Sequence, residues 1–267
     1  GVLIESQIKY ARIIAPISKA IWIIIRFILF FFQMISFKMK AKLKKKLKQD
    51  LDLSINLAFM FEKRLAQMIL KEMEVEPTVS QSSAIEAISS FLFDDNQDSV
   101  FLLKGYAGTG KTLLISTIVK SIKQFRVKTE LLAPTGRAAK VLSAYTSQQA
   151  FTIHKKIYRQ QNTNDGVGRF SLDYNKNANT LFIVDEASMI SNSLSDSSVF
   201  GSGRLLDDLI EYVYNGKNCR LMLVGDTAQL PPVNLAISPA LDSKVLENYN
   251  LKVYSAILSD VVRQAEN

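Results

Sequence analysis

The chain has only one cysteine, Cys219, so a framework of intramolecular disulfides is excluded. This absence fits a reducing compartment. Glycine and proline are also few, at 11 and 6 of 267 residues, and there is no internal repeat. Because 48% of the residues are hydrophobic and 22% are charged, the chain is neither wholly disordered nor collagen-like. Its length allows one large domain or two small ones.

Most of the chain also lacks an excess of positive charge. Residues 1–50 hold eleven basic and two acidic residues, whereas residues 51–267 hold 22 basic and 23 acidic ones. The formal charge of +8 therefore comes from the N-terminal fifth of the chain. Net charge gives no indication of what the larger part binds.

One apolar run, residues 17–37, is long enough to cross a bilayer as a helix. Arg26 near its middle would cost about 2.5–3.5 kcal/mol on insertion scales. Seven lysines follow between Lys38 and Lys48, and they would keep the rest of the chain in the cytoplasm. Three interpretations stay open: an inner-membrane anchor, an unselected upstream extension (the sequence starts with Gly, not Met), and a buried or partner-binding helix. A signal peptide fits poorly, because the run is long and no small-residue cleavage site precedes the lysines.

The sequence indicates three parts. Residues 1–55 are the apolar and Lys-rich extension, residues 56–76 are a helical lead-in, and residues 77–267 are a domain. The lead-in has an apolar stripe at helical spacing, and we expect the stripe to pack on the domain that follows. The members of the stripe are Leu57, Met60, Phe61, Leu65, Met68 and Ile69.

After Pro77, short apolar runs alternate with helical patterns. The runs predict buried parallel strands, because they are rich in branched or aromatic residues and are bounded by Gly, Pro or Asp. The predicted strands are Val100–Leu103, Leu131–Ala133, Leu181–Val184 and Leu221–Val224, and the predicted helices are Lys111–Gln124, Gly136–Gln148 and Arg204–Tyr214. Gln160–Thr180 is expected to be a loop or hairpin insertion, and Ser191–Gly203 a surface loop. The alternation predicts an α/β fold with a parallel sheet flanked by helices.

A glycine-rich segment follows the first predicted strand and opens the first predicted helix. It matches G-x-x-x-x-G-K-[ST] in full, so its main-chain N–H groups and the helix N-terminus are expected to bind phosphate oxygens. Lys111 would reach the β- and γ-phosphates, and the Thr112 hydroxyl would bind Mg²⁺. The residues expected to bind the nucleoside triphosphate here are Gly105, Tyr106, Ala107, Gly108, Thr109, Gly110, Lys111 and Thr112.

A pair of carboxylates ends the third predicted strand, at the sheet edge where doubly wound folds bind ligands. Asp185 is expected to hold the magnesium ion, and Glu186 is the candidate general base for the attacking water. Asp226 ends the next strand at the same edge. Gln229, three residues later, has a carboxamide that can donate to a γ-phosphate and accept from water.

Seven segments in a fixed order resemble the RecD-like group of superfamily 1 DNA helicases, over about residues 76–264. The segments are PTVSQ at 77–81, GYAGTGKT at 105–112, APTGRAAKVLS at 133–143, TIHKKI at 152–157, VDEASMIS at 184–191, GDTAQLPPV at 225–233 and DVVRQ at 260–264. A phosphate loop alone would leave many ATPase families open. The later segments reduce the number of ATPase families that match the sequence. The resemblance implies a RecA-like domain that binds ATP and Mg²⁺.

The resemblance also implies roles for particular residues. Gln81 matches the glutamine that recognises adenine, and Gln229 matches the residue that couples the γ-phosphate to movement. Arg263 matches an arginine that contacts the γ-phosphate from the far side of the cleft, an interaction worth about 10³–10⁵ in rate in related enzymes. The segments that touch single-stranded DNA contribute Pro134, Thr135, Arg137, Thr152 and His154. From the residues alone, His154 could instead be a packing residue and Arg137 a solvated charge.

The resemblance leads us to expect an ATP-dependent DNA helicase that moves 5′→3′, with nuclease or repair proteins as possible partners. Such helicases need two RecA-like domains, and the sequence ends just after Arg263. We therefore expect either the N-terminal motor domain of a longer protein or a truncated gene product, with weak ATP turnover by the 267 residues alone. The alternative function is a membrane-tethered nucleotide-binding module that does not unwind DNA.

Overall fold

The computed structural model describes residues 26–28, 42, 44–49, 53, 56–161, 169–192, 199–226, 228–229 and 237–261. The chain divides into two compact units, residues 1–57 and 58–267. The described residues of the first unit are helical. The predicted membrane span lies outside the described residues except for 26–28. Within the described part of the chain, we find no helix with the length and apolarity that a membrane span requires.

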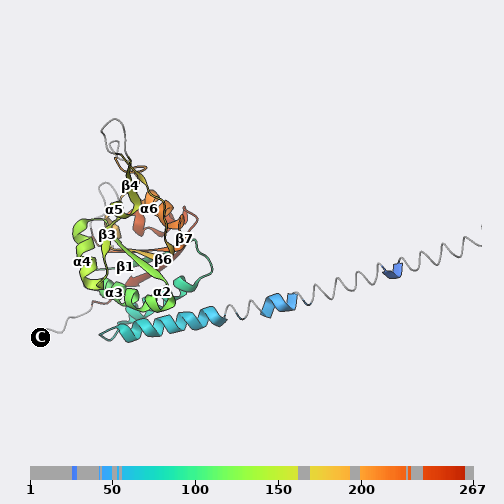
Figure 1. Cartoon of the computed structure of the whole chain (residues 1–267). Coiled ribbons are helices and arrows are strands. Elements are labelled where there is room, and N and C mark those ends of the chain that lie inside the picture. Colours follow the sequence, from blue (N-terminus) through green and yellow to red (C-terminus); the bar gives the residue numbers. More distant parts are fainter. Residues whose placement is uncertain are drawn as a thin grey trace, which may run out of the picture. The chain divides into compact units, whose positions relative to one another are not determined.

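The second unit is built on a six-stranded sheet in the order β3-β2-β6-β7-β1-β8 (Figure 1). Every neighbouring pair in this sheet is parallel. The strands are β1 (Ser99–Gly105), β2 (Lys128–Ala133), β3 (Ala150–Thr152), β6 (Ala178–Val184), β7 (Lys217–Gly225) and β8 (Lys252–Leu258). All four predicted strands are confirmed, each as the buried part of a longer strand. In this order, β7 separates the strand of the glycine-rich loop from the strand of the acid pair.

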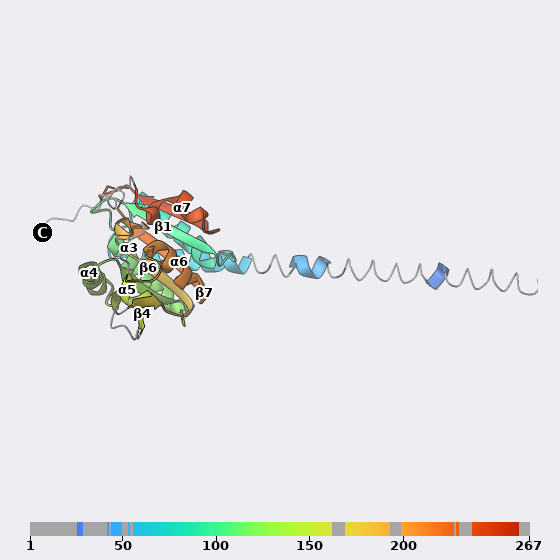
Figure 2. The same ribbon diagram turned by 90° about the horizontal axis from the view of Figure 1, so that it is seen from above.

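Helices connect the strands and cover the sheet. They are α2 (Val79–Phe93), α3 (Lys111–Ile122), α4 (Gly136–Thr146), α5 (Ile153–Ile157), α6 (Leu205–Tyr214) and α7 (Ser243–Glu247), with 3-10 turns η1 (Lys123–Phe125), η2 (Ala187–Met189) and η3 (Pro239–Leu241). The three predicted helices are confirmed as α3, α4 and α6. Figure 2 shows α4 and α7 at opposite ends of the sheet, where they contact the edge strands β3 and β8 respectively.

Alternate residues of each central strand enter two separate cores, as the period of a strand requires. On β1, Val100 and Leu102 belong to a core that also contains apolar residues of α5, α6 and α7. Phe101 and Leu103 belong to a second core, with residues of α2, α3 and α4. The sheet is therefore buried on both faces, which explains its nearly continuous apolar strands.

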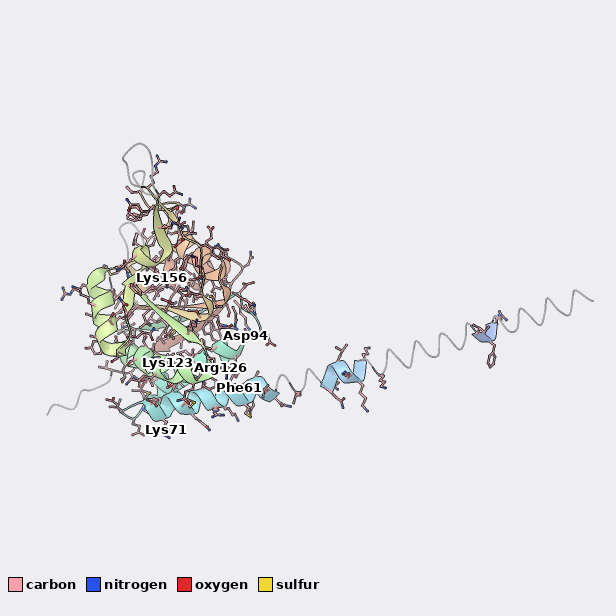
Figure 3. The ribbon with its side chains drawn as sticks, in the orientation of Figure 1. Phe61, Lys71, Asp94, Lys123, Arg126 and Lys156 are labelled. Atoms are coloured by element: carbon pink, nitrogen blue, oxygen red, sulfur yellow. The ribbon has the colours of Figure 1, made fainter. Side chains whose placement is uncertain are left out.

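The helical lead-in packs on the second core along only part of the predicted stripe. Residues 58–72 are helical, and Leu65 and Ile69 are fully buried in that core. Phe61 stacks on Phe93 at the end of α2, with ring centroids 5.7 Å apart (Figure 3). Met60, in contrast, is 53% exposed. The prediction that the whole stripe packs was wrong at this end of the helix.

The insertion after α5 is a hairpin of β4 (Tyr158–Gln161) and β5 (Arg169–Leu172), which pair antiparallel. This pairing confirms the expected hairpin, although β6 already begins at Ala178, inside the predicted loop. The prediction missed the edge strands β3 and β8. β8 gave no buried run to recognise, because all its residues except the buried Leu258 are exposed or only partly buried.

Asp94, the C-cap residue of α2, joins this helix to the edge strand β8 (Figure 3). Its Oδ2 accepts hydrogen bonds from Lys252 Nζ at 2.7 Å and from Tyr254 Oη at 2.6 Å. Burial opposes ionisation, but these hydrogen bonds outweigh it and lower the pKa of Asp94 to about 2. Because the folded-state value lies below the ordinary one, the stabilisation is complete above pH 4 and disappears between about pH 4 and pH 2.

We expect the Asp94→Asn variant to lose this pH dependence. The free energy of unfolding of the wild-type chain should fall more steeply between pH 4 and pH 2 than that of the variant. Urea denaturation at a series of pH values measures the difference. Asp95→Asn is the matched control and should keep the wild-type slope. Equal slopes for the wild-type chain and Asp94→Asn would contradict the expectation.

Candidate functional site

The glycine-rich loop joins the end of β1 to the start of α3. Gly110, the N-cap residue of α3, has φ = 84°, a left-handed backbone conformation that residues other than glycine rarely adopt. Among the residues that the structure describes, no side chain caps this end of the helix. The first N–H groups of α3 are therefore available for an anion, and the helix dipole favours negative charge at the same place.

Lys111 holds the loop together from its inner side. Its Nζ donates to Gly105 O at 2.7 Å and to Tyr106 O at 2.9 Å. The same Nζ lies 3.9 Å from Asp226 Oδ2 at the end of β7, and that carboxylate is almost fully buried. The ammonium group is thus placed between the loop and the neighbouring strand end, where a phosphate bound by the loop would meet it.

The acid pair lies two strands away from the loop, at the end of β6. The main-chain N–H of Asp185 donates to Leu132 O at 3.0 Å, which fixes this end of β6 against β2. Glu186 has φ = 56°, an uncommon conformation for a residue other than glycine, and its N–H donates to Asp185 Oδ1 at 3.0 Å. Burial raises the pKa of Asp185 to about 6, and the nearby Glu186 charge adds to the effect.

One cavity of about 380 Å³ brings six of the predicted site residues together. Its lining includes Thr112 of the loop, the acid pair Asp185 and Glu186, and Gln229 of the turn after β7. Thr135 and Arg137 at the start of α4 line the same cavity. Residues predicted to act in hydrolysis and residues predicted to touch DNA therefore share one space.

Gln81 lies beside the loop and has little contact with solvent. It is only 1% exposed, and its Nε2 donates to Thr109 O at 3.1 Å. Its Oε1 accepts from Thr78 N at 3.1 Å, as part of a capping box at the start of α2. The side chain therefore connects α2 to the glycine-rich loop. Adenine recognition by Gln81 stays a prediction.

Two of the predicted DNA-binding residues cap helices at the same edge of the sheet. Thr135 accepts from Ala138 N at the start of α4, and Thr152 accepts from Lys155 N at the start of α5, each at 3.2 Å. Pro134 lies between β2 and the first of these caps. Arg137 is exposed. These positions are compatible with contacts to a strand of nucleic acid, and the contacts themselves stay predictions.

His154, the fifth predicted DNA-binding residue, packs in an aromatic cluster at the base of the hairpin. Its ring centroid lies 5.1 Å from that of Phe200 and 5.6 Å from that of Tyr158. Burial lowers the pKa of His154, so the neutral imidazole is favoured. The structure thus gives this histidine a packing role in addition to the predicted contact with DNA.

Arg263 lies outside the described residues. The part of its segment that the structure describes lies close to the start of α2, because Asp260 Oδ2 accepts from Ser80 N at 3.0 Å. In addition, Val261 Cγ1 lies 3.8 Å from the position that a Cβ on Gly108 would occupy. The end of β8 is therefore adjacent to both α2 and the glycine-rich loop.

Two polar residues in this region were not predicted as site residues. Ser188, three residues after Asp185, donates its hydroxyl to Gln229 Oε1 at 2.6 Å. Ser238 is 3% exposed, and its Oγ lies within 3.0 Å of the carbonyl oxygens of Ala187 and Ile190. Ser188 stands inside the DEASM segment, so the motif contained the signal. Ser238 has no such motif.

The fold and the site define a P-loop nucleoside triphosphatase domain of the RecA-like type. The chain belongs to the AAA domain family, whose model matches residues 78–267. It is 32% identical to the ATP-dependent RecD2 DNA helicase of Deinococcus radiodurans over 139 residues, which are 51% of this chain and 16% of that protein. The domain is of the RecA-like kind found in superfamily 1 helicases, which confirms the predicted resemblance.

Two further proteins are similar to this chain. An uncharacterized protein of Acanthamoeba polyphaga mimivirus is 29% identical over 195 residues, 64% of this chain and 36% of that protein. The crystal structure of the Pif1 helicase from Candida albicans aligns with a TM-score of 0.44 and 19% identity, over 71% of this chain and 41% of that one. The chain thus spans well under two thirds of the curated relatives it matches.

Proposed function

We propose that this chain is the ATP-hydrolysing motor domain of a DNA helicase that moves 5′→3′ along single-stranded DNA. The observation that carries the proposal is the shared cavity. Thr112, Glu186 and Gln229 line it from the side of the sheet, and Thr135 and Arg137 line it from α4. A γ-phosphate bound in this cavity would therefore lie next to the start of α4.

In the proposed reaction, the loop amides and the N-terminus of α3 bind the triphosphate. Lys111 exchanges its hydrogen bonds to the two loop carbonyls for contacts with the β- and γ-phosphates. Their negative charge then offsets the charge of the ammonium group. Glu186 accepts a proton from the attacking water, and Gln229 contacts the γ-phosphate. Arg263 would complete the site from across the cleft.

The residues present suit a magnesium ion. The Thr112 hydroxyl and the Asp185 carboxylate line one cavity, and Mg²⁺ prefers oxygen ligands of this kind. Ionised Asp185 is disfavoured by burial, so a divalent cation would stabilise its charge. When bound, Mg²⁺ would neutralise charge on the β- and γ-phosphate oxygens.

Lys111→Ala tests the proposed nucleotide site. Hydrogen bonds from a charged donor contribute about 1.5–3 kcal/mol each, so we expect the affinity for ATP to fall about 10- to 100-fold. Isothermal titration with ATP and Mg²⁺ measures this change, and ATP hydrolysis with and without single-stranded DNA measures the motor activity. Lys120→Ala is the matched control, because Lys120 is exposed near the other end of the same helix.

Equal ATP affinity in Lys111→Ala and Lys120→Ala would contradict the proposed nucleotide site. If ATP binds normally but single-stranded DNA does not stimulate hydrolysis by the protein that contains this domain, the helicase assignment is removed and an ATP-binding domain remains. Translocation direction is tested on the protein that contains this domain, with partial duplexes that carry either a 5′ or a 3′ single-stranded tail.

A further inference from the structure

Gln229 is exposed to the cavity but is anchored at one atom. Its Oε1 accepts the hydroxyl hydrogen of Ser188, with the two oxygens 2.6 Å apart. A carboxamide oxygen can only accept, so this contact leaves the Nε2 hydrogens as the donors that Gln229 can offer to another group. The contact therefore sets which end of the carboxamide is available to a ligand.

The anchor itself belongs to a rigid part of the fold. Ser188 is 2% exposed in the middle of η2. The carbonyls of Ala187 and Ile190, on either side of it, are both within 3.0 Å of the buried Ser238 hydroxyl. A Cβ on Gly225, the last residue of β7, would lie 3.1 Å from Ser188 N, so the strand end packs directly against this turn.

The turn that carries Gln229 is fixed from its other side by Asp226. Asp226 Oδ1 accepts from Ala228 N at 2.8 Å, and Asp226 Oδ2 faces Lys111 Nζ at 3.9 Å. The main chain next to Gln229 is thus held at the end of β7, the strand next to the glycine-rich loop. The tip of the Gln229 side chain is bound to Ser188 in η2, two residues after Glu186.

We infer that Ser188 is a positioning residue that orients the Gln229 carboxamide, so that its amide hydrogens point to the place of the γ-phosphate. This inference rests on the proposed role of Gln229. Ser188 is 2% exposed and acts through its hydrogen bond to Gln229. Its effect is to give the domain a preference for a triphosphate over a diphosphate, because only the triphosphate offers an acceptor to the oriented amide.

The test compares the affinities of the full 267-residue chain for adenosine 5′-(β,γ-imido)triphosphate and for ADP, both with Mg²⁺. We expect Ser188→Ala to reduce the preference for the triphosphate analogue by about 3- to 10-fold, which is the worth of one neutral hydrogen bond, and to leave ADP binding unchanged. Gln229→Ala should reduce the preference at least as much. The double variant should show no further loss, because the two residues act through one contact.

Ser89→Ala is the matched control, since this buried hydroxyl donates to Ile85 O inside α2, away from Gln229. It should leave the preference unchanged, and thermal denaturation confirms that each variant is folded. If Gln229→Ala lowers the preference and Ser188→Ala does not, the inference is overturned and the proposed function stands. Equal weakening of both nucleotides in Ser188→Ala also overturns it. No effect of Gln229→Ala would overturn the inference together with the proposed role of Gln229.

Discussion

Replacing Glu186 with Gln is expected to lower the rate of ATP hydrolysis about 10²–10⁴-fold, while the affinity for ATP with Mg²⁺ stays within a few-fold. A general base contributes to the chemical step and little to binding of the substrate, because the proton it accepts moves only in the transition state. The glutamine side chain keeps the size and polarity of the glutamate but cannot accept that proton. Phosphate release by the protein that contains this domain, in the presence of single-stranded DNA, measures the rate.

Two controls make this result specific. Glu211→Gln removes an exposed carboxylate on α6 and should hydrolyse ATP at the wild-type rate. Gln229→Ala should also lose turnover, but with an altered preference between triphosphate and diphosphate. A wild-type rate in Glu186→Gln would end the assignment of Glu186 as general base. A parallel loss of affinity and rate would instead assign Glu186 to binding.

The second large effect concerns stability and involves Arg220, a buried arginine on β7. Its guanidinium donates to the main-chain oxygens of Phe91, Asp94 and Asn96 and to the Ser99 hydroxyl. Phe91 and Asp94 belong to the last turn of α2 and its C-cap, where carbonyl groups have no partner within the helix. Arg220 thus caps the C-terminal end of α2 and hydrogen-bonds to the loop that leads into β1.

We expect Arg220→Leu to lower the free energy of unfolding by about 3 kcal/mol, because several buried acceptors would lose their donor. For a domain of this size the midpoint of thermal unfolding should fall by roughly 6–12 °C. Arg204→Leu is the matched control. Arg204 is largely exposed and pairs with Asp207 at 3.5 Å, so its loss should cost less than about 1 kcal/mol. Indistinguishable midpoints for the two variants would contradict this account.

Burial patterns made much of the fold predictable. The central strands are buried on both faces, so Val100–Leu103 and Leu221–Val224 appear in the sequence as unbroken apolar runs. The edge strand β8 could not be found in this way, since one side of it faces solvent and its pairing with β1 depends on contacts across about 150 residues. Helix ends were predicted two residues too long in α3, where the chain continues as a 3-10 turn.

The candidate site was predictable where the chemistry requires a residue type at a fixed spacing. The spacing of glycine, lysine and threonine located the loop, and Asp185 was expected at a strand end. The partners of these residues were harder to predict, because they come from segments that are distant in the sequence. Neither the contact of Gln81 with Thr109 nor that of Ser188 with Gln229 is encoded by local spacing. Both depend on how the strands are ordered in the sheet.

That order has a geometric consequence for the site. Because β7 lies between β1 and β6, the loop strand and the acid strand are two interstrand spacings apart, about 9.6 Å. Adjacent strands would place the two strand ends only about 4.8 Å apart. The middle strand thus separates the two strand ends, and its own end supplies Asp226, whose Oδ2 lies 3.9 Å from Lys111 Nζ.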